Sequence, residues 1–328
     1  MGQENRPLVP SSREEKRMGK IAFLFSGQGS QYVGMGKDLY DHNPAARVIF
    51  DQTDSELSYG LSRLCFSGAQ EELNRTENTQ PAILAVSIAA FEALKGHGIF
   101  PDVIAGFSLG EYSALVCSEV LNYREAVKLV RKRGLYMQEA VPEGQGGMAA
   151  VLGMDTSKVE EACTAVGNEA VIKVANYNCP GQVVISGEKK ALEAASSKLA
   201  EFGAKKVIPL QVSGPFHTSF MQPAAEKLKR ELSLLEFGQP KYPIISNVTA
   251  DYIKDSLHVA ELLPRQVMNS VLWEMSIRKM LADGVDTFIE IGPGSTLRGF
   301  VRKINKNTTL LNVEDMSSLN STVKFLNP

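Results

Sequence analysis

The stretch GFSLG at residues 106–110 places a serine between two glycines. The pattern G-x-S-x-G is typical of a serine on a tight strand-to-helix turn, which exposes the hydroxyl at the edge of a sheet. The context agrees, because the apolar run DVIAGF leads into Ser108 and a helical pattern follows it. Backbone N–H groups at the start of that helix would stabilise a developing oxyanion. We therefore interpret Ser108 as a nucleophile for acyl chemistry.

A serine nucleophile needs a base to take its proton, and two of the four histidines are candidates. His217 lies in VSGPFHTSF, where Gly and Pro follow a predicted strand and can aim the side chain back at the sheet edge. His258, with Asp255 or Asp251 as the acid, would fit the chain order of α/β-hydrolases. However, SLHVAELL is typical of a polar surface helix. The residues alone favour His217 and leave His258 open.

An arginine lies on the apolar side of the predicted helix YREAVKLVRKRGLYMQEAV, at residues 123–141. At about 100° per residue, Arg133 falls in the middle of the apolar arc, opposite Arg131 and Lys132. An inward guanidinium is costly without an anion. That anion is either a buried Asp or Glu, or a substrate carboxylate, which a guanidinium can clamp through two hydrogen bonds.

A glycine-rich loop, FSGQGSQ at residues 25–31, follows the first predicted strand. It is not a dinucleotide site, because Tyr32 stands where the third glycine of G-x-G-x-x-G belongs, and no Walker lysine follows. The stretch EGQGGMA fits G-x-G-x-x-A, but no strand precedes it. Loops that follow parallel strands share one edge of the sheet. We therefore expect the loop at 25–31 to lie beside the serine turn and complete an oxyanion hole.

The elements that must position these residues alternate between strand and helix, which indicates an α/β architecture. KIAFLF (20–25), DVIAGF, YPIISNV and TFIEIG read as strands, and a helix is expected to open at Gln80-Pro81. The middle of the chain reads strand-helix-strand-strand-helix-strand, with YNCPG as a turn, which is the ferredoxin-like βαββαβ order. The domain division expected from this is a core at 18–141 and 212–328, a small subdomain at 142–211, and a flexible N-terminal extension at 1–17.

Composition argues against several classes of function. The net charge of −2 makes no global case for binding nucleic acid or a membrane surface. No apolar run reaches the roughly 18 residues of a membrane span, and the polar start lacks a signal peptide's apolar segment. Four separate cysteines without C-x-x-C or zinc spacing favour reduced thiols in the cytoplasm. No histidine cluster suggests a metal site.

Several motifs together resemble the malonyl-CoA:acyl carrier protein transacylases, acyltransferases that load extender units for fatty acid and polyketide synthesis. They are FSGQGSQYVGMG, TQPAILAVS, GFSLGEYSAL, RGLYMQEAVPEGQGGMAAVLG, NCPGQVVISG, PFH and IEIGPGSTL, in this order from Met18 to about Asn312. The resemblance implies an α/β-hydrolase-like core with a parallel sheet and an inserted ferredoxin-like subdomain. It also implies a monomer that uses malonyl-CoA as donor and holo-acyl carrier protein as acceptor, with no permanently bound cofactor.

The resemblance assigns roles at matching positions. Ser108 would be the nucleophile and His217 its base. The backbone N–H groups of Gln28 and Leu109 would form the oxyanion hole. A backbone carbonyl, at Gln266 in this sequence, would orient the histidine in place of a triad acid.

The resemblance also bears on selectivity. Arg133 would bind the free carboxylate of malonate. Many members have histidine where this chain has Phe107, a departure that could alter acyl selectivity or water access. Phe216, just before the histidine, resembles the phenylalanine that accompanies malonyl rather than methylmalonyl preference, because its ring leaves no space for an α-methyl group.

Two half-reactions through a malonyl-Ser108 ester predict ping-pong kinetics. The alternatives are a serine hydrolase, such as a thioesterase or esterase, on the same turn, and a carrier-binding scaffold without turnover. The acidic carrier protein calls for a basic patch. Two candidate pairs are Lys205 with Lys206 and Arg302 with Lys303.

Overall fold

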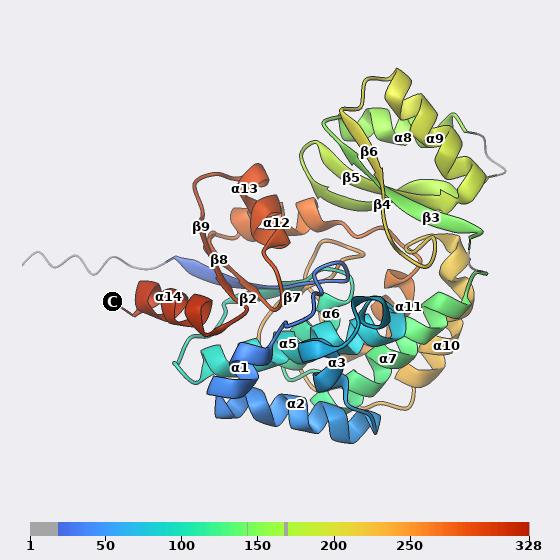
Figure 1. Ribbon diagram of the computed structural model, residues 1–328. Helices are drawn as coiled ribbons and strands as arrows, with labels where there is room; N and C mark the ends of the chain where they lie inside the picture. The colour runs from blue at the N-terminus through green and yellow to red at the C-terminus, as the bar shows by residue number, and fades with distance from the viewer. Residues whose placement is uncertain (1–18, 143, 167–169, 328) are drawn as a thin grey trace, which may run out of the picture.

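A five-stranded parallel sheet forms the centre of the computed structural model, which describes residues 19–142, 144–166 and 170–327 (Figure 1). The expected N-terminal extension at 1–17 lies outside the described residues. The strand order is β7-β2-β1-β8-β9, and every neighbouring pair is parallel. The strands are β1 (Lys20–Phe25), β2 (Val103–Gly106), β7 (Ile244–Ile245), β8 (Val285–Ile291) and β9 (Thr309–Val313).

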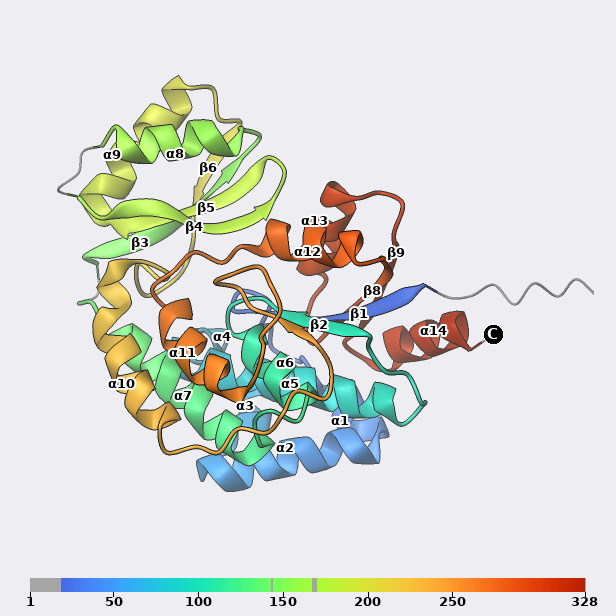
Figure 2. The ribbon, with the colours of Figure 1, turned by 180° about the vertical axis from the view of Figure 1, so that it is seen from behind.

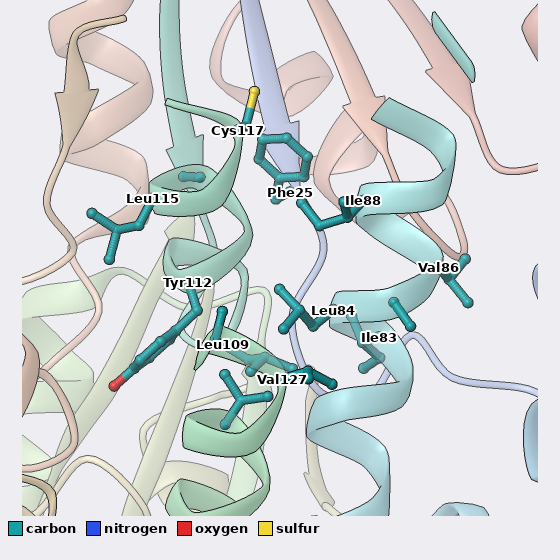
Figure 3. Packing of buried hydrophobic residues seen from close by; sticks show 14 of the residues in the cluster. Phe25, Ile83, Leu84, Val86, Ile88, Leu109, Tyr112, Leu115, Cys117 and Val127 are labelled. Atoms are coloured by element: carbon teal, nitrogen blue, oxygen red, sulfur yellow. The ribbon is translucent and has the colours of Figure 1, made fainter. Parts of the chain in front are cut away.

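Helices cover both faces of this sheet, as the continuously apolar strands require. In β1, Phe23 and Phe25 pack into one hydrophobic cluster, while Ala22 and Leu24 pack into another on the opposite face. The first cluster gathers α5 (Thr76–Lys95), α6 (Gly110–Cys117) and α7 (Tyr123–Glu139), which Figure 3 shows around Phe25. The second gathers α12 (Trp273–Ala282) and α13 (Thr296–Ile304).

The remaining core helices, most of them labelled in Figure 2, each contribute buried residues to the first cluster. They are α1 (Lys37–His42), α2 (Pro44–Leu57), α3 (Leu61–Ser67), α4 (Gln70–Leu73), the 3-10 turn η1 (Ser219–Met221), α10 (Gln222–Leu232), α11 (Ser256–Gln266) and α14 (Met316–Leu326). Within the described ranges, no helix is both long and apolar enough to cross a membrane.

A separate four-stranded antiparallel sheet has the order β4-β5-β3-β6. Its elements follow the chain as β3 (Gly146–Leu152), α8 (Thr156–Thr164), β4 (Ile172–Cys179), β5 (Gln182–Glu188), α9 (Lys189–Glu201) and β6 (Lys206–Pro209). The two helices cover the face turned away from the core (Figure 1). This βαββαβ unit confirms the predicted fold class, an α/β-hydrolase-like core with a ferredoxin-like insert. The exact domain boundaries stay a prediction.

Three local expectations were wrong. Helix α5 begins at Thr76, so Pro81 lies inside it rather than at its start. Strand β4 continues to Cys179, so the turn expected over YNCPG is confined to its last residues. Strand β7 is only two residues long: it pairs with β2, and Ile245 also forms an isolated antiparallel bridge with Tyr252, where the chain turns back.

Candidate active site

Ser108 lies on the tight turn between β2 and α6, as the sequence pattern predicts. Its φ of 50° lies in the left-handed region, which a non-glycine residue adopts only where its surroundings enforce it. The flanking glycines are required by close packing: a Cβ on Gly106 would lie 1.9 Å from the backbone of Gly110. A Cβ on Gly110 would lie 2.2 Å from the carbonyl oxygen of Phe25 in β1.

The turn is held from outside by Asn247, a buried residue just after β7. The backbone N–H of Ser108 donates to Oδ1 of Asn247 at 2.6 Å, and Nδ2 of Asn247 donates to the carbonyl of Gly106 at 2.7 Å. One amide side chain thus fixes the backbone that leads into the nucleophile, at Gly106 and at Ser108 itself. The sequence does not single out Asn247, because its only signal is an amide side chain at the carboxyl end of a predicted strand.

His217 is the histidine that meets Ser108. The Ser108 Oγ and the His217 Nε2 are 2.9 Å apart. On the other side of the ring, Nδ1 lies 2.9 Å from the carbonyl oxygen of Gln266 and 3.1 Å from that of Asn269. Because carbonyl oxygens only accept, Nδ1 carries the proton, and Nε2 is left to accept from the serine hydroxyl. The contribution of Asn269 had no signal in the sequence.

The environment keeps this imidazole neutral. Burial, and then the positive charge of Arg133, lower the pKa of His217 to about 4. The two carbonyl acceptors oppose this shift but do not overcome it. Near neutral pH the ring is therefore uncharged and able to take a proton.

His258, the alternative base, lies in the first turn of α11 and not at the site. Asp255 is the N-cap of α11, and its side chain accepts from the backbone N–H of His258 at 2.9 Å. The His258 Nδ1 faces the backbone N–H of Lys254 at 3.4 Å. The structure therefore brings His217, and not His258, to the serine.

Arg133 is 1% exposed and points into the same site from α7. It donates to Oε1 of Gln80 at 2.8 Å, to Oε1 of Gln266 at 2.9 Å and to Oγ of Ser108 at 3.3 Å. Among the described residues it forms no ion pair with a carboxylate, and its Nε has no hydrogen-bond partner. Of the two explanations for an inward arginine, the buried ion pair is thus not observed.

The glycine-rich loop after β1 lies against the serine turn, as expected from the shared sheet edge. A Cβ on Gly27 would lie 2.4 Å from the carbonyl oxygen of Phe107, so only glycine allows this approach. Across the described chain, the backbone N–H groups of Gln28 and Leu109 donate to no protein acceptor. Both groups are therefore free to bind a ligand oxygen.

Ser108, His217, Arg133 and the loop residue Gln28 line a cavity of about 270 Å³ between the two sheets. Phe107 and Phe216 both contribute to its wall. Phe107 packs edge-on against Trp273, with ring centroids 5.4 Å apart, and Phe216 is 5% exposed. On the opposite side, the small sheet contributes the polar residues Asn176, Asn178 and Gln182 together with apolar residues such as Met148 and Val184. A larger groove of about 520 Å³, lined from α2, α7 and α10, contains none of the site residues.

The described ranges contain no group of three or more His, Cys, Asp or Glu side chains placed to bind a metal ion. The four cysteines are buried and free of disulfides.

The fold and the serine–histidine pair are shared by two classes of protein, the α/β serine hydrolases and the serine acyltransferases, and comparison with known proteins places the chain in the second. The chain belongs to the acyl transferase domain family, whose model matches residues 22–323. It is 50% identical over 310 residues to the malonyl CoA-acyl carrier protein transacylase of Bacillus subtilis (strain 168), which covers 94% of this chain and 98% of that protein. This finding confirms the resemblance that the motifs predict.

Solved structures agree with this assignment. The malonyl CoA-acyl carrier protein transacylase of Clostridium perfringens is 47% identical with a TM-score of 0.90, covering 94% of this chain and 97% of that one. A malonyl-transacylase in complex with a type II polyketide synthase acyl-carrier protein is 40% identical with a TM-score of 0.91. That match covers 93% of this chain and 99% of the other.

Proposed function

We propose that this protein transfers a malonyl group from malonyl-CoA to the phosphopantetheine thiol of holo-acyl carrier protein, through a malonyl-Ser108 ester. The observation that carries the proposal is the position of Arg133. A buried guanidinium without a carboxylate partner lies 3.3 Å from a serine Oγ that also contacts a neutral histidine. The names of the similar proteins support the same substrates.

In the first half-reaction, His217 takes the proton of Ser108 as the Oγ attacks the thioester carbonyl. The backbone N–H groups of Gln28 and Leu109 hold the oxyanion. The C–S bond breaks, and the proton passes from His217 to the departing CoA thiolate. In the second half-reaction, His217 takes the proton of the carrier thiol, whose sulfur attacks the ester, and the proton returns to Ser108. Thioester exchange of this kind needs no resident cofactor.

Two features support malonyl selectivity. The guanidinium of Arg133 forms no ion pair with a carboxylate of the described residues, so a substrate without a carboxylate of its own leaves the charge unpaired. The buried ring of Phe216 lies in the cavity wall, where it would contact an α-methyl group.

Phe107 offers no hydrogen-bonding group to hold a hydrolytic water. By family resemblance we also expect a monomer that acts in the cytoplasm.

The test varies both substrates and both histidines. Initial rates at several fixed concentrations of holo-acyl carrier protein are expected to give parallel double-reciprocal lines in malonyl-CoA. Replacing the base, His217→Ala, should reduce transfer by about 10³-fold, whereas His258→Ala should retain wild-type transfer. Free malonate as the main product, or loss of activity in His258→Ala, would favour the serine hydrolase instead.

A further inference from the structure

Glu111 is a buried carboxylate that the reaction above does not use. It lies in α6, three positions after the nucleophile, and is fully buried. Most buried neighbours in this helix are apolar or small, and burying a carboxylate costs free energy unless strong hydrogen bonds offset it. Its hydrogen bonds do not serve its own helix. They reach two residues from separate, distant segments of the chain.

The first is Gln266, at the end of α11. Its Nε2 donates to Oε2 of Glu111 at 2.7 Å and to the carbonyl of Ser108 at 2.9 Å. Both groups only accept, so they fix which end of the amide faces them. The amide oxygen is thereby turned toward Arg133, and the backbone carbonyl of Gln266 contacts the His217 ring.

The second is Asn247. Its backbone N–H donates to the same oxygen, Oε2 of Glu111, at 3.2 Å. Its side chain holds the backbone of the serine turn at Gly106 and Ser108. One carboxylate oxygen is thus bonded to both residues that position the nucleophile, the base and the guanidinium.

We propose that Glu111 is a positioning residue, whose Oε2 fixes Gln266 and Asn247 and thereby keeps Ser108, His217 and Arg133 in reactive geometry. This inference deepens the proposed function and rests on it only for the substrate. The role proposed for Glu111 depends on the hydrogen-bond acceptor at Oε2 and not on the negative charge of the carboxylate. Oε1 of Glu111 has no hydrogen-bond partner among the described residues, so it can carry a proton while Oε2 still accepts.

The pKa of Glu111 is consistent with this arrangement. Burial raises it to about 7, and the hydrogen bonds and Arg133 only partly offset the burial. Both protonation states are therefore populated near neutral pH, and the Oε2 acceptor is present in each.

The experiment compares three variants of the full chain. Glu111→Met removes the acceptor at similar length, Glu111→Gln keeps an acceptor oxygen without charge, and Ser113→Ala is the control. Ser113 is buried in the same helix, and its hydroxyl has no partner among the described residues. The first readout is the labelling rate of Ser108 by a fluorophosphonate, which needs no malonyl group. The second is loading from malonyl-CoA, and thermal unfolding is followed in parallel.

Glu111→Met is expected to slow both reactions by about 10²-fold, the typical cost of slightly misplaced reacting groups. Glu111→Gln and Ser113→Ala should stay within about threefold of wild type, because the geometry is retained. Wild-type rates in Glu111→Met, or a Glu111→Gln variant as slow as Glu111→Met, would overturn the proposal.

If Glu111→Met does not fold, Glu111→Asp replaces it, because its carboxylate is withdrawn by one methylene. It should slow labelling about tenfold, and wild-type labelling would overturn the proposal. If wild-type protein reacts with the fluorophosphonate but never loads malonyl, the proposed function fails while the role of Glu111 is still tested.

Discussion

Arg133 affects its neighbours in two ways at the scale of single residues. Its guanidinium donates to Ser108 Oγ, and its charge, together with burial, lowers the pKa of His217. The positive charge of Arg133 makes His217 a weaker base, but it keeps the imidazole neutral and therefore able to accept a proton. When a substrate carboxylate binds the guanidinium, that charge is compensated, and the pKa of His217 should rise. Binding the correct acyl group would thus strengthen the base that acts on it.

Replacing the guanidinium should therefore change selectivity more than general reactivity. Arg133→Ala is expected to reduce malonyl transfer by about 10²- to 10³-fold, because the substrate carboxylate loses its buried charged partner. Acetyl transfer should fall by less than about tenfold. Arg131→Ala, on the exposed side of the same helix, is the matched control. Equal losses for malonyl-CoA and acetyl-CoA would contradict the clamp.

The pH dependence should follow His217. A protonated imidazole cannot accept the serine proton, and a pKa of about 4 keeps the ring neutral down to low pH. The kcat/KM for malonyl-CoA should therefore stay level from neutral pH to about pH 5, then fall as pH drops through the pKa. Removing the neighbouring charge in Arg133→Ala should move this acid limb toward neutral pH. A wild-type limb near the ordinary histidine pKa would contradict the account.

At the scale of elements, the loop after β1 and the serine turn after β2 meet because parallel strands end at one edge. Their contact is backbone against backbone, at Gly27 and Phe107. This contact sets where the backbone N–H of Gln28 lies relative to that of Leu109. The oxyanion hole that we propose would thus be a property of two loops held together, not of either loop alone.

A methyl group at this contact should disturb the oxyanion hole. The Cβ of Gly27→Ala would lie 2.4 Å from a carbonyl oxygen, so the loop must shift. Loss of one oxyanion donor costs about 10²- to 10³-fold in rate, and acylation of Ser108 should fall accordingly. Gly60→Ala is the control, because its Cβ meets only ordinary contact at 3.6 Å. Unchanged acylation in Gly27→Ala would show that the loop does not contribute a donor.

The sequence indicates Ser108, His217 and Arg133 because each has a local signal: a glycine-framed turn, a Gly-Pro exit from a strand, and a charge on an apolar arc. It does not reveal Gln80, which the pattern places at the start of a predicted helix. Nor does it reveal Asn247 and Asn269, because their partners come from distant segments. For Gln266 the resemblance suggests only the carbonyl, while its amide contacts are visible only in three dimensions.

The fold follows the same rule. Long apolar strands and the βαββαβ order could be predicted, since hydrophobic runs and turn residues are local. The start of α5 could not be predicted, because proline is usually found in the first turn of a helix, whereas Pro81 lies inside α5. The length of β7 could not be predicted either, because the chain turns back after Ile245 to bridge Tyr252, a contact that the apolar pattern does not reveal.

At the scale of the whole molecule, the cavity lies between the two sheets, so an acyl group on a long arm must enter there. Helix α13 borders this entrance through Thr296, Leu297 and Phe300. The exposed end of the same helix carries Arg302 and Lys303, and Lys303 donates to Gln182 of the cavity wall. This is the better placed of the two basic pairs for an acidic carrier protein.

Reversing the charges of Arg302 and Lys303 tests whether this surface binds the carrier protein. Arg302→Glu combined with Lys303→Glu should raise the KM for holo-acyl carrier protein about tenfold, given up to about 1 kcal/mol for each surface charge pair. Transfer to free pantetheine should be unchanged. The same reversal at Lys205 and Lys206 should have a smaller effect. A larger effect at Lys205 and Lys206 would place the carrier on the small subdomain instead.

The most direct test of the central claim is intact-protein mass spectrometry after brief mixing with malonyl-CoA, without any carrier protein. We predict a mass gain of one malonyl group that is absent in Ser108→Ala and is discharged by added holo-acyl carrier protein. Free malonate and CoA accumulating without an adduct on Ser108 would contradict the account, because water and not the carrier thiol would then be the acceptor.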